Sequence, residues 1–318
     1  MKKQRLTGLV AATHTPLNPD GAINLPMVEV QAEHLLRNSI QAAFIAGSTG
    51  ECHSLTLAER LQLTQRWTEV SRGTPMQVAV HVGSNCLSDA QALARQAGEL
   101  GVTAIAALAP SYFRPRSLAR LVEWCADIAA EAPETPFYYY DIPTLTGVSF
   151  PMVEFLSRAA DRIPTLAGIK FTSYDVFSYQ LALNLDREAF DVLWGADEGL
   201  LAALALGAHN AIGTSYNYAA PVYHRMLHAV QKGNWDLARQ EQYRIAQLIH
   251  LFLRYGVLPA TKILMGMLGV DVGPARAPHE NLTAEQQCTF RADLEKLGFF
   301  EWIGEPTAQA GQVPARAS

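Results

Sequence analysis

The chain has 318 residues, of which 49% are apolar, and a formal net charge of −5. The length allows one large domain or two ordinary ones, and the apolar content is ample for a buried core. The acidic balance and the lack of a dense run of Lys and Arg argue against nucleic acid or an anionic membrane as a partner. No apolar stretch approaches the roughly 20 residues of a membrane span. The apolar run after the basic residues 1–5 is short and merges into the first expected strand, so we expect no signal peptide.

The cysteines are far apart in the sequence and form no C-x-x-C pair, which argues against a zinc or redox site. Disulfides are not implied for a chain of this length. We therefore expect four reduced thiols in a cytoplasmic protein, and no metal site, from the positions Cys52, Cys86, Cys125 and Cys288.

Eight short apolar runs without polar alternation are typical of strands that are buried on both faces, as in a parallel sheet. They cover residues 8–13, 42–46, 77–82, 104–109, 136–140, 166–171, 191–194 and 208–212. Helix-like segments lie between most of them, at residues 57–71, 88–100, 118–131 and 152–160. Thr56 and Glu59 form a capping-box pattern, Gly101 is placed to end a helix, and Pro151 is expected in a first helical turn.

This alternation predicts an α/β protein with a parallel sheet, and eight units favour a closed (β/α)₈ TIM barrel over an open doubly wound sheet. No G-x-G-x-x-G follows the first run, which also argues against the open sheet. After about residue 218 the pattern becomes consecutive helices, at residues 221–231, 235–254, 260–268 and 283–297. We predict a barrel over residues 6–230, a C-terminal helical extension over 231–303 and a disordered tail over 304–318, which is rich in Ala, Gly, Gln and Pro.

Lys170 and Tyr140 are the candidate catalytic residues, because each ends an apolar run. In a barrel enzyme the active site gathers at the C-terminal ends of the strands. A lysine there forms a Schiff base with a carbonyl compound once burial has lowered the pKa of its amine from near 10.4. Of the three consecutive tyrosines, Tyr138 and Tyr140 must face one side of the strand and Tyr139 the other. The alternatives are that Lys170 pairs with a carboxylate and that the tyrosines only pack.

Hydroxyl and carboxylate side chains follow three other runs. Ser48 and Thr49 lie in a Gly-Ser-Thr-Gly turn whose hydroxyls and backbone N–H groups suit a carboxylate ligand, although an ordinary turn would look the same. Glu51 is expected to hold this turn by accepting backbone hydrogen bonds. Asp197 and Glu198 suit a polyhydroxylated substrate or, alternatively, a helix N-terminus. The histidines show no metal-ligand spacing and are interpreted as structural: His14, His53, His81 and His209.

Four motifs together resemble the pyruvate-dependent class I aldolases of the dihydrodipicolinate synthase/N-acetylneuraminate lyase family. They are the Gly-Leu-Val-Ala-Ala-Thr segment at residues 8–13, Gly-Ser-Thr-Gly-Glu at 47–51, Tyr-Tyr-Asp-Ile-Pro at 139–143 and Gly-Ile-Lys-Phe-Thr at 168–172. They occur in the family's order, and the resemblance covers residues 6 to about 300. It implies a cytoplasmic homotetramer of TIM barrels that acts on pyruvate and a sugar acid without a cofactor.

The resemblance also implies a role for each residue that matches a family motif. Lys170 would form the Schiff base with pyruvate, and Tyr140 would relay protons. Ser48 and Thr49 would bind the pyruvate carboxylate. Tyr112 would be supplied to the active site of a neighbouring subunit. The remaining substrate-binding positions would be Thr172, Gly195, Asp197, Glu198, Gly213 and Thr214.

Two positions bear on the substrate. Leu145 stands where dihydrodipicolinate synthases usually carry an arginine, and a leucine cannot bind a carboxylate, so that activity is disfavoured. The Pro-x-Leu-Thr-Gly form at residues 143–147 is similar to the lyase branch, which implies cleavage of N-acetylneuraminate. Asp141 stands where the lyases usually have histidine, and we expect it to change the charge near the site. A pyruvate aldolase or dehydratase for another 2-keto-3-deoxy sugar acid remains the alternative, and a non-catalytic pyruvate binder is disfavoured by the intact Lys170, Tyr140 and Ser48.

Overall fold

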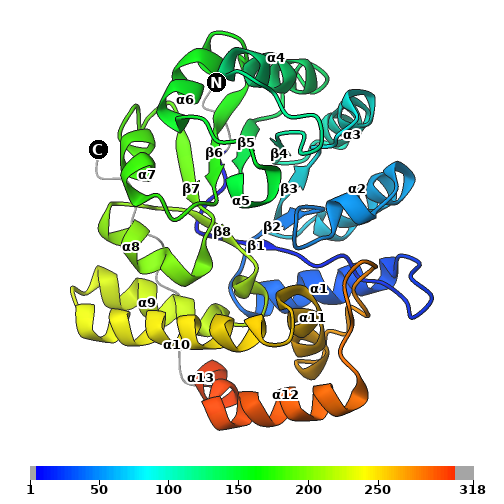
Figure 1. The fold of residues 1–318 in the computed structure, drawn as a ribbon, viewed down its shortest axis with the longest axis vertical. Helices are drawn as coiled ribbons and strands as arrows, with labels where there is room; N and C mark the ends of the chain where they lie inside the picture. The colour runs from blue at the N-terminus through cyan, green and yellow to red at the C-terminus, as the bar shows by residue number, and fades with distance from the viewer. Residues whose placement is uncertain (1–4, 305–318) are drawn as a thin grey trace.

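Eight parallel strands close into a barrel, in sequence order, in the computed structural model, which describes residues 5–304 (Figure 1). The predicted fold class is confirmed. The strands are β1 Leu9–Ala12, β2 Ala42–Ile45, β3 Gln77–His81, β4 Ala104–Leu108, β5 Phe137–Asp141, β6 Leu166–Phe171, β7 Asp191–Trp194 and β8 Ala211–Gly213.

The last strand begins later than predicted, at Ala211 rather than at position 208. The N–H of Ala208 donates to the carbonyl of Ala203, so Ala208 belongs to the C-terminal end of the preceding helix and not to the strand. The side chain of Asn210 then accepts the N–H of Gly8 at 2.8 Å. Apolar character alone could not separate this connection from the strand.

Helices cover the outside of the barrel and continue beyond it (Figure 1). They are α1 Leu25–Arg37, α2 Leu57–Ser71, α3 Leu87–Glu99, α4 Leu118–Ala129, α5 Pro143–Thr146, α6 Met152–Ala160, α7 Val176–Leu183, α8 Leu200–Ala205, α9 Ala220–Gln231, α10 Trp235–Leu253, α11 Val257–Met267, α12 Ala284–Leu297 and α13 Phe299–Gly304. The capping box of Thr56 and Glu59 is present. Pro151 is the N-cap of α6 rather than a residue of its first turn, because the first helical residue is Met152.

Helices α9 and α10 pack side by side, and Figure 1 shows α10 running along α9 with α12 below it. A buried ion pair joins the first two: Arg225 Nη2 lies 2.9 Å from Glu241 Oε2. The predicted division of the chain at residue 230 stays a prediction. The predicted tail lies outside the described residues from position 305 onward. Within residues 5–304, no individual helix has the length and apolar character to cross a membrane, and only α10 and α11 taken together, bent by 113°, meet that criterion.

Residues of β5 and β6 alternate between the barrel interior and the layer beneath the helices. Tyr138 and Tyr140 belong to the interior cluster, whereas Tyr139 packs in the outer layer, as predicted. In β6, Ala167 faces the interior but Ile169 faces outward. A register shift against β5, between its pairings with Leu166 and Gly168, produces this change of side. Without the shift, regular alternation would turn Lys170 out of the barrel.

Gly168 permits this irregularity, because a Cβ atom at this position would lie 1.8 Å from the carbonyl oxygen of Asp191 in β7. We predict that Gly168→Ala lowers the free energy of unfolding by about 3 kcal/mol, since only movement of the backbone relieves the clash. Chemical denaturation measures this change.

Gly266→Ala is the matched control. Gly266 lies in α11, and a Cβ atom there would meet nothing nearer than 3.8 Å. Because alanine is the better helix former, this variant should be unchanged or more stable by up to about 1 kcal/mol. Equal stability of the two variants would contradict the steric role of Gly168.

Candidate active site

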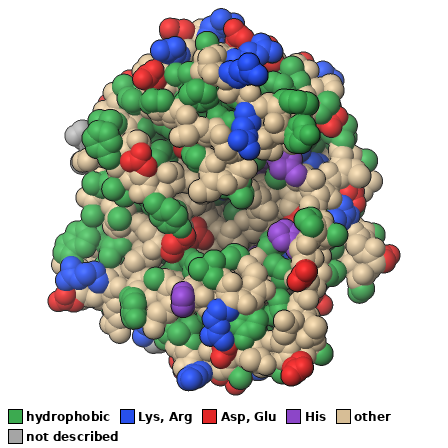
Figure 2. All heavy atoms as spheres, viewed as in Figure 1, with side chains coloured by type: hydrophobic (Ala, Val, Ile, Leu, Met, Phe, Trp, Pro, Cys, Tyr) green, Lys and Arg blue, Asp and Glu red, His purple; other side chains and the backbone are tan. Residues whose placement is uncertain are grey.

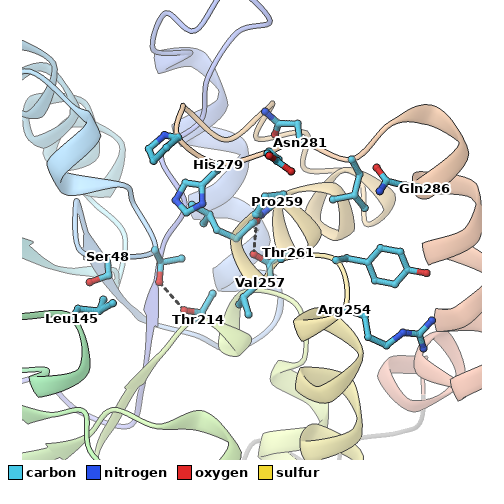
Figure 3. Close-up of a pocket in the computed structure, with 17 residues that line it drawn as sticks. Ser48, Leu145, Thr214, Arg254, Val257, Pro259, Thr261, His279, Asn281 and Gln286 are labelled. Carbon is cyan, nitrogen blue, oxygen red and sulfur yellow. Dashed lines mark hydrogen bonds between the residues drawn. The ribbon is translucent and has the colours of Figure 1, made fainter.

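A cavity of about 490 Å³ opens at the C-terminal ends of the strands. Figure 2 shows a hollow on this face of the molecule, over the centre of the barrel. The predicted residues that line it are Ser48, Thr49, Tyr140, Lys170, Thr172, Gly195, Asp197, Glu198, Gly213 and Thr214. A second cavity of about 810 Å³ shares Ser48, Thr49, Thr214 and Val257 with the first and continues along α11 (Figure 3).

The Lys170 side chain lies inside the barrel between aromatic rings. Its Nζ is 4.0 Å from the ring centroid of Tyr140 and 4.4 Å from that of Phe44, and the residue is 4% exposed. Burial lowers the pKa of the amine to about 7, and the charges of Asp197 and Cys52 oppose this shift. At neutral pH a large fraction of Lys170 is therefore the nucleophilic free amine. Among residues 5–304, no carboxylate forms an ion pair with it, which disfavours the alternative that Lys170 pairs with a carboxylate.

The hydroxyl of Tyr140 forms a hydrogen bond of 3.2 Å with Ser48 Oγ. Its ring makes edge contacts with Phe44 and His81, which fix its orientation. Burial raises the pKa of the phenol well above its ordinary value, and the hydrogen bond with Ser48 opposes this shift. The phenol is therefore protonated at neutral pH and acts as a donor as well as an acceptor.

The turn after β2 is hydrogen-bonded to residues at the ends of two strands that do not neighbour β2 in the sheet. Ser48 bonds to Tyr140 on β5, and Thr49 Oγ1 lies 2.6 Å from Thr214 Oγ1 at the end of β8. Figure 3 shows the latter hydrogen bond beside the second cavity. The backbone N–H of Glu51 donates to the carbonyl of Ser48. The two hydroxyls thus lie at the mouth of the barrel, on the side that Lys170 and Tyr140 occupy.

Asp197 and Glu198 follow β7, the strand next to the one that carries Lys170, and both line the cavity. Asp197 Oδ2 accepts hydrogen bonds from the backbone N–H and the hydroxyl of Ser215, at 2.7 and 2.6 Å. Asp197 and Glu198 also lie in the first turn of the 3₁₀-helix Asp197–Gly199, so the helix N-terminus stays an alternative role for them. Burial raises the pKa of both carboxyl groups. Glu198 accepts a hydrogen bond from the hydroxyl of Tyr174.

Gly213 is required by Asp197, because a Cβ atom on it would lie 1.7 Å from Asp197 Oδ1. The carboxylate therefore occupies the space that a side chain on β8 would fill. This brings the ends of β7 and β8 together and leaves Thr214 facing the cavity.

Two residues that the sequence associates with the site, Tyr112 and Asp141, do not line the cavity. Tyr112 is 80% exposed, contacts Phe113 and does not line the cavity of its own chain. The expectation that Asp141 alters the charge of the site is corrected: Asp141 follows the inward-facing Tyr140 and does not line either cavity. Burial raises its pKa to about 7. The substitution at this position therefore says little about which sugar the cavity admits.

The C-terminal helices contribute cavity residues that no sequence pattern marked. Phe252 and Leu253 come from the end of α10 and Val257 from the start of α11, and Tyr174 follows β6. An apolar residue near a helix end looks the same in the sequence whether it packs or lines a cavity. Within the described part of the chain no group of three or more His, Cys, Asp or Glu could hold a metal, and the four cysteines are free.

The reactivity of Lys170 tests its burial directly. We predict that its acylation by acetic anhydride, followed by peptide mass spectrometry, rises about tenfold per pH unit up to a midpoint near pH 7 and then levels. Nα-acetyl-lysine in the same tube should show a midpoint near 10.4. A shared midpoint would contradict the burial of the amine.

Comparisons with known proteins agree with this geometry. The dihydrodipicolinate synthetase family matches residues 5–297. The chain is 37% identical to N-acetylneuraminate lyase of Gallus gallus over 93% of this chain and 97% of the relative. It is 41% identical to N-acetylneuraminate lyase B of Xenopus laevis over 78% of this chain and 93% of the relative.

Among solved structures, N-acetylneuraminate lyase from Aliivibrio salmonicida has a TM-score of 0.90 at 37% identity, covering 94% of this chain and 98% of that one. The Proteus mirabilis N-acetylneuraminate lyase has a TM-score of 0.89 at 35% identity, covering 92% of this chain and 99% of that one. By motif, fold, cavity and relatives, this chain belongs to the dihydrodipicolinate synthetase family.

Proposed function

We propose that this chain is a class I aldolase, a carbon–carbon lyase that cleaves N-acetylneuraminate to N-acetylmannosamine and pyruvate. The observation that carries the proposal is the buried Lys170 amine, beside Tyr140 and Ser48 in one cavity. Relatives named N-acetylneuraminate lyase, 35–41% identical over most of the chain, support the choice of substrate.

The reaction begins at Lys170. Its free amine attacks the C2 keto carbon of the open-chain sugar acid, and the adduct takes up one proton from solvent and loses water to leave a protonated Schiff base. The hydroxyls of Ser48 and Thr49 and the backbone N–H groups of their turn bind the C1 carboxylate. The protonated nitrogen then withdraws electrons from C2, which prepares the neighbouring C3–C4 bond for cleavage.

Tyr140 relays the proton in the cleavage step. The C4 hydroxyl gives its proton to the phenol oxygen as the C3–C4 bond breaks, and the bonding electrons form the enamine on the lysine. Because the raised pKa keeps the phenol protonated, Tyr140 must release its own proton at the same time. The bound carboxylate and Ser48, whose Oγ is 3.2 Å away, are the groups that pass it on. Protonation of C3 and hydrolysis then release pyruvate.

The cavity residues that follow β6, β7 and β8 bind the sugar chain. Carboxylates and hydroxyls are presented to the polyol by Asp197, Glu198, Thr172 and Thr214. Gly195 and Gly213 line the same cavity, and their missing side chains leave room for Thr172 Oγ1 and Asp197 Oδ1. Leu145, at the edge of the second cavity, offers no positive charge for an acidic second substrate, which disfavours dihydrodipicolinate synthesis. The alternative is a pyruvate-dependent aldolase or dehydratase for another 2-keto-3-deoxy sugar acid. No step above uses a cofactor.

Pyruvate release from N-acetylneuraminate, followed with a lactate dehydrogenase couple, tests the function. We predict release by the wild type and a rate lower by at least about 10³-fold in Lys170→Ala, since the covalent step is lost. Circular dichroism should show that the variant is folded. Full activity of Lys170→Ala would contradict the mechanism. Release from a different 2-keto-3-deoxy acid alone would favour the alternative substrate.

We further propose a cytoplasmic homotetramer, supported by the free cysteines and by two apolar surface patches. One patch is the pair Tyr112 and Phe113, 80% and 85% exposed. The other lies on and near α7, with Tyr174, Phe177 and Leu181 at 64%, 69% and 46%. Monomers rarely expose such patches, and a dihedral tetramer needs two kinds of interface.

Phe177 lies in the second patch, away from the cavity lining. We predict that the wild type sediments as a tetramer and that Phe177→Glu sediments as a smaller species, because a charge in an apolar interface is costly to desolvate. Analytical ultracentrifugation measures both masses. A monomeric wild type, or an unchanged mass in the variant, would contradict the assignment of this patch.

A further inference from the structure

The turn that carries Ser48 and Thr49 has a residue with strained backbone dihedral angles on each side. Within residues 5–304 three non-glycine residues have positive φ, and two of them, Ala46 at 52° and Glu51 at 58°, flank this turn. Such left-handed conformations cost free energy and persist only where the surroundings hold them. Contacts with the surrounding structure must therefore stabilise the backbone at each end of the turn.

The contacts that stabilise the first end of the turn, at Ala46, lie within the barrel. His81 on β3 places Nδ1 2.9 Å from the carbonyl oxygen of Ala46, in a fully buried hydrogen bond. The turn itself closes with the N–H of Cys52 donating to the carbonyl of Gly47. These contacts are local to β2 and β3 and do not involve the C-terminal helices.

The contacts that stabilise the second end of the turn, at Glu51, come from the C-terminal part of the chain. Lys262 on α11 places Nζ 2.7 Å from Glu51 Oε1, with both side chains 1% exposed. The same ammonium donates to the carbonyl of Pro274 at 2.7 Å. The backbone N–H of Arg276 donates to Glu51 Oε2, also at 2.7 Å. Both carboxylate oxygens are therefore engaged by segments more than 200 residues away in the sequence.

Helix α11 lies beside the turn along its first half. Figure 3 shows Val257, Pro259 and Thr261 next to Ser48 and Thr214 at the second cavity. Thr261, the neighbour of Lys262, shares a hydrogen bond of 2.9 Å with His14, just after β1. A shift of α11 would thus reach the turn through Glu51.

We propose that the Glu51–Lys262 ion pair is a positioning device for the pyruvate carboxylate, through which the C-terminal extension sets how tightly the Ser48–Thr49 turn binds that group. Neither residue touches the substrate: Lys262 acts through Glu51, and Glu51 acts through the backbone of the turn. The inference rests on the proposed function, because it takes the ligand of this turn to be the pyruvate carboxylate.

A purely structural ion pair would join α11 to the barrel without affecting recognition. The Arg225–Glu241 pair is a matched control for this purely structural role. It is also buried and joins α9 to α10, and neither residue lines either cavity. Removing all partners of a buried ion pair leaves no stranded charge in the interior. Glu241 also pairs with Arg244, at 3.1 Å, so the control variant removes that residue too. The variants Glu51→Gln/Lys262→Met and Arg225→Met/Glu241→Gln/Arg244→Met are therefore comparable.

The experiment compares two keto compounds that differ only at C1. Pyruvate and neutral pyruvamide are titrated against the enzyme with borohydride, and reduced adduct is quantified by intact mass to give a half-saturating concentration for each. The wild type should prefer pyruvate strongly. The preference is the ratio of the half-saturating concentrations of pyruvamide and pyruvate. We expect this ratio to be about tenfold smaller in Glu51→Gln/Lys262→Met than in the wild type, because pyruvate alone binds more weakly. In the control variant the ratio should stay within about twofold of the wild type.

An unchanged preference in a folded Glu51→Gln/Lys262→Met variant would overturn the inference, as would an equal loss for both compounds. If this variant does not fold, Glu51→Asp provides the test: it keeps the charge but shortens the side chain, and it must also reduce the preference. A wild type that forms no adduct with pyruvate would contradict the proposed function itself. Normal adduct formation with an unaltered preference in the variants would contradict only this inference.

Discussion

Desolvation of the Lys170 ammonium is the constraint on which the rest of the site depends. The aromatic rings of Phe44 and Tyr140 replace water around its Nζ and lower its pKa to about 7, which makes an ordinary amine a nucleophile at neutral pH. The side chain reaches that environment only because the register shift at Gly168 turns it into the barrel. The same burial raises the pKa of the Tyr140 phenol, so one physical cause prepares the nucleophile and keeps the proton relay protonated.

The barrel alone does not complete the site. Its strands place Lys170 and Tyr140 rigidly, because both project from a buried sheet, whereas the carboxylate-binding residues lie on a strained turn. Helices α10 and α11 supply Phe252 and Val257 to the cavity wall, and α11 supplies Lys262 to the turn through Glu51. The helices that follow the barrel therefore form part of the cavity wall.

Local pattern was enough to predict the barrel, since strands buried on both faces are short apolar runs. The alternation of side chains along a strand also predicted that Tyr138 and Tyr140 face the opposite side from Tyr139. The same alternation, continued by one residue, would have placed Asp141 outside the cavity. Other features depend on contacts remote in sequence. The strand irregularity at Gly168 depends on the backbone of Asp191, and the partner of Glu51 lies 211 residues away. Cavity residues near helix ends, such as Val257, carry no local signature at all.

Covalent trapping with the sugar acid itself tests the central claim most directly. The enzyme is mixed with N-acetylneuraminate and borohydride, digested, and its lysine peptides are examined by mass spectrometry. The account predicts one reduced pyruvoyl group on Lys170 and no adduct on other lysines. An adduct on a different lysine, or cleavage of the sugar acid without any trapped adduct, would contradict it.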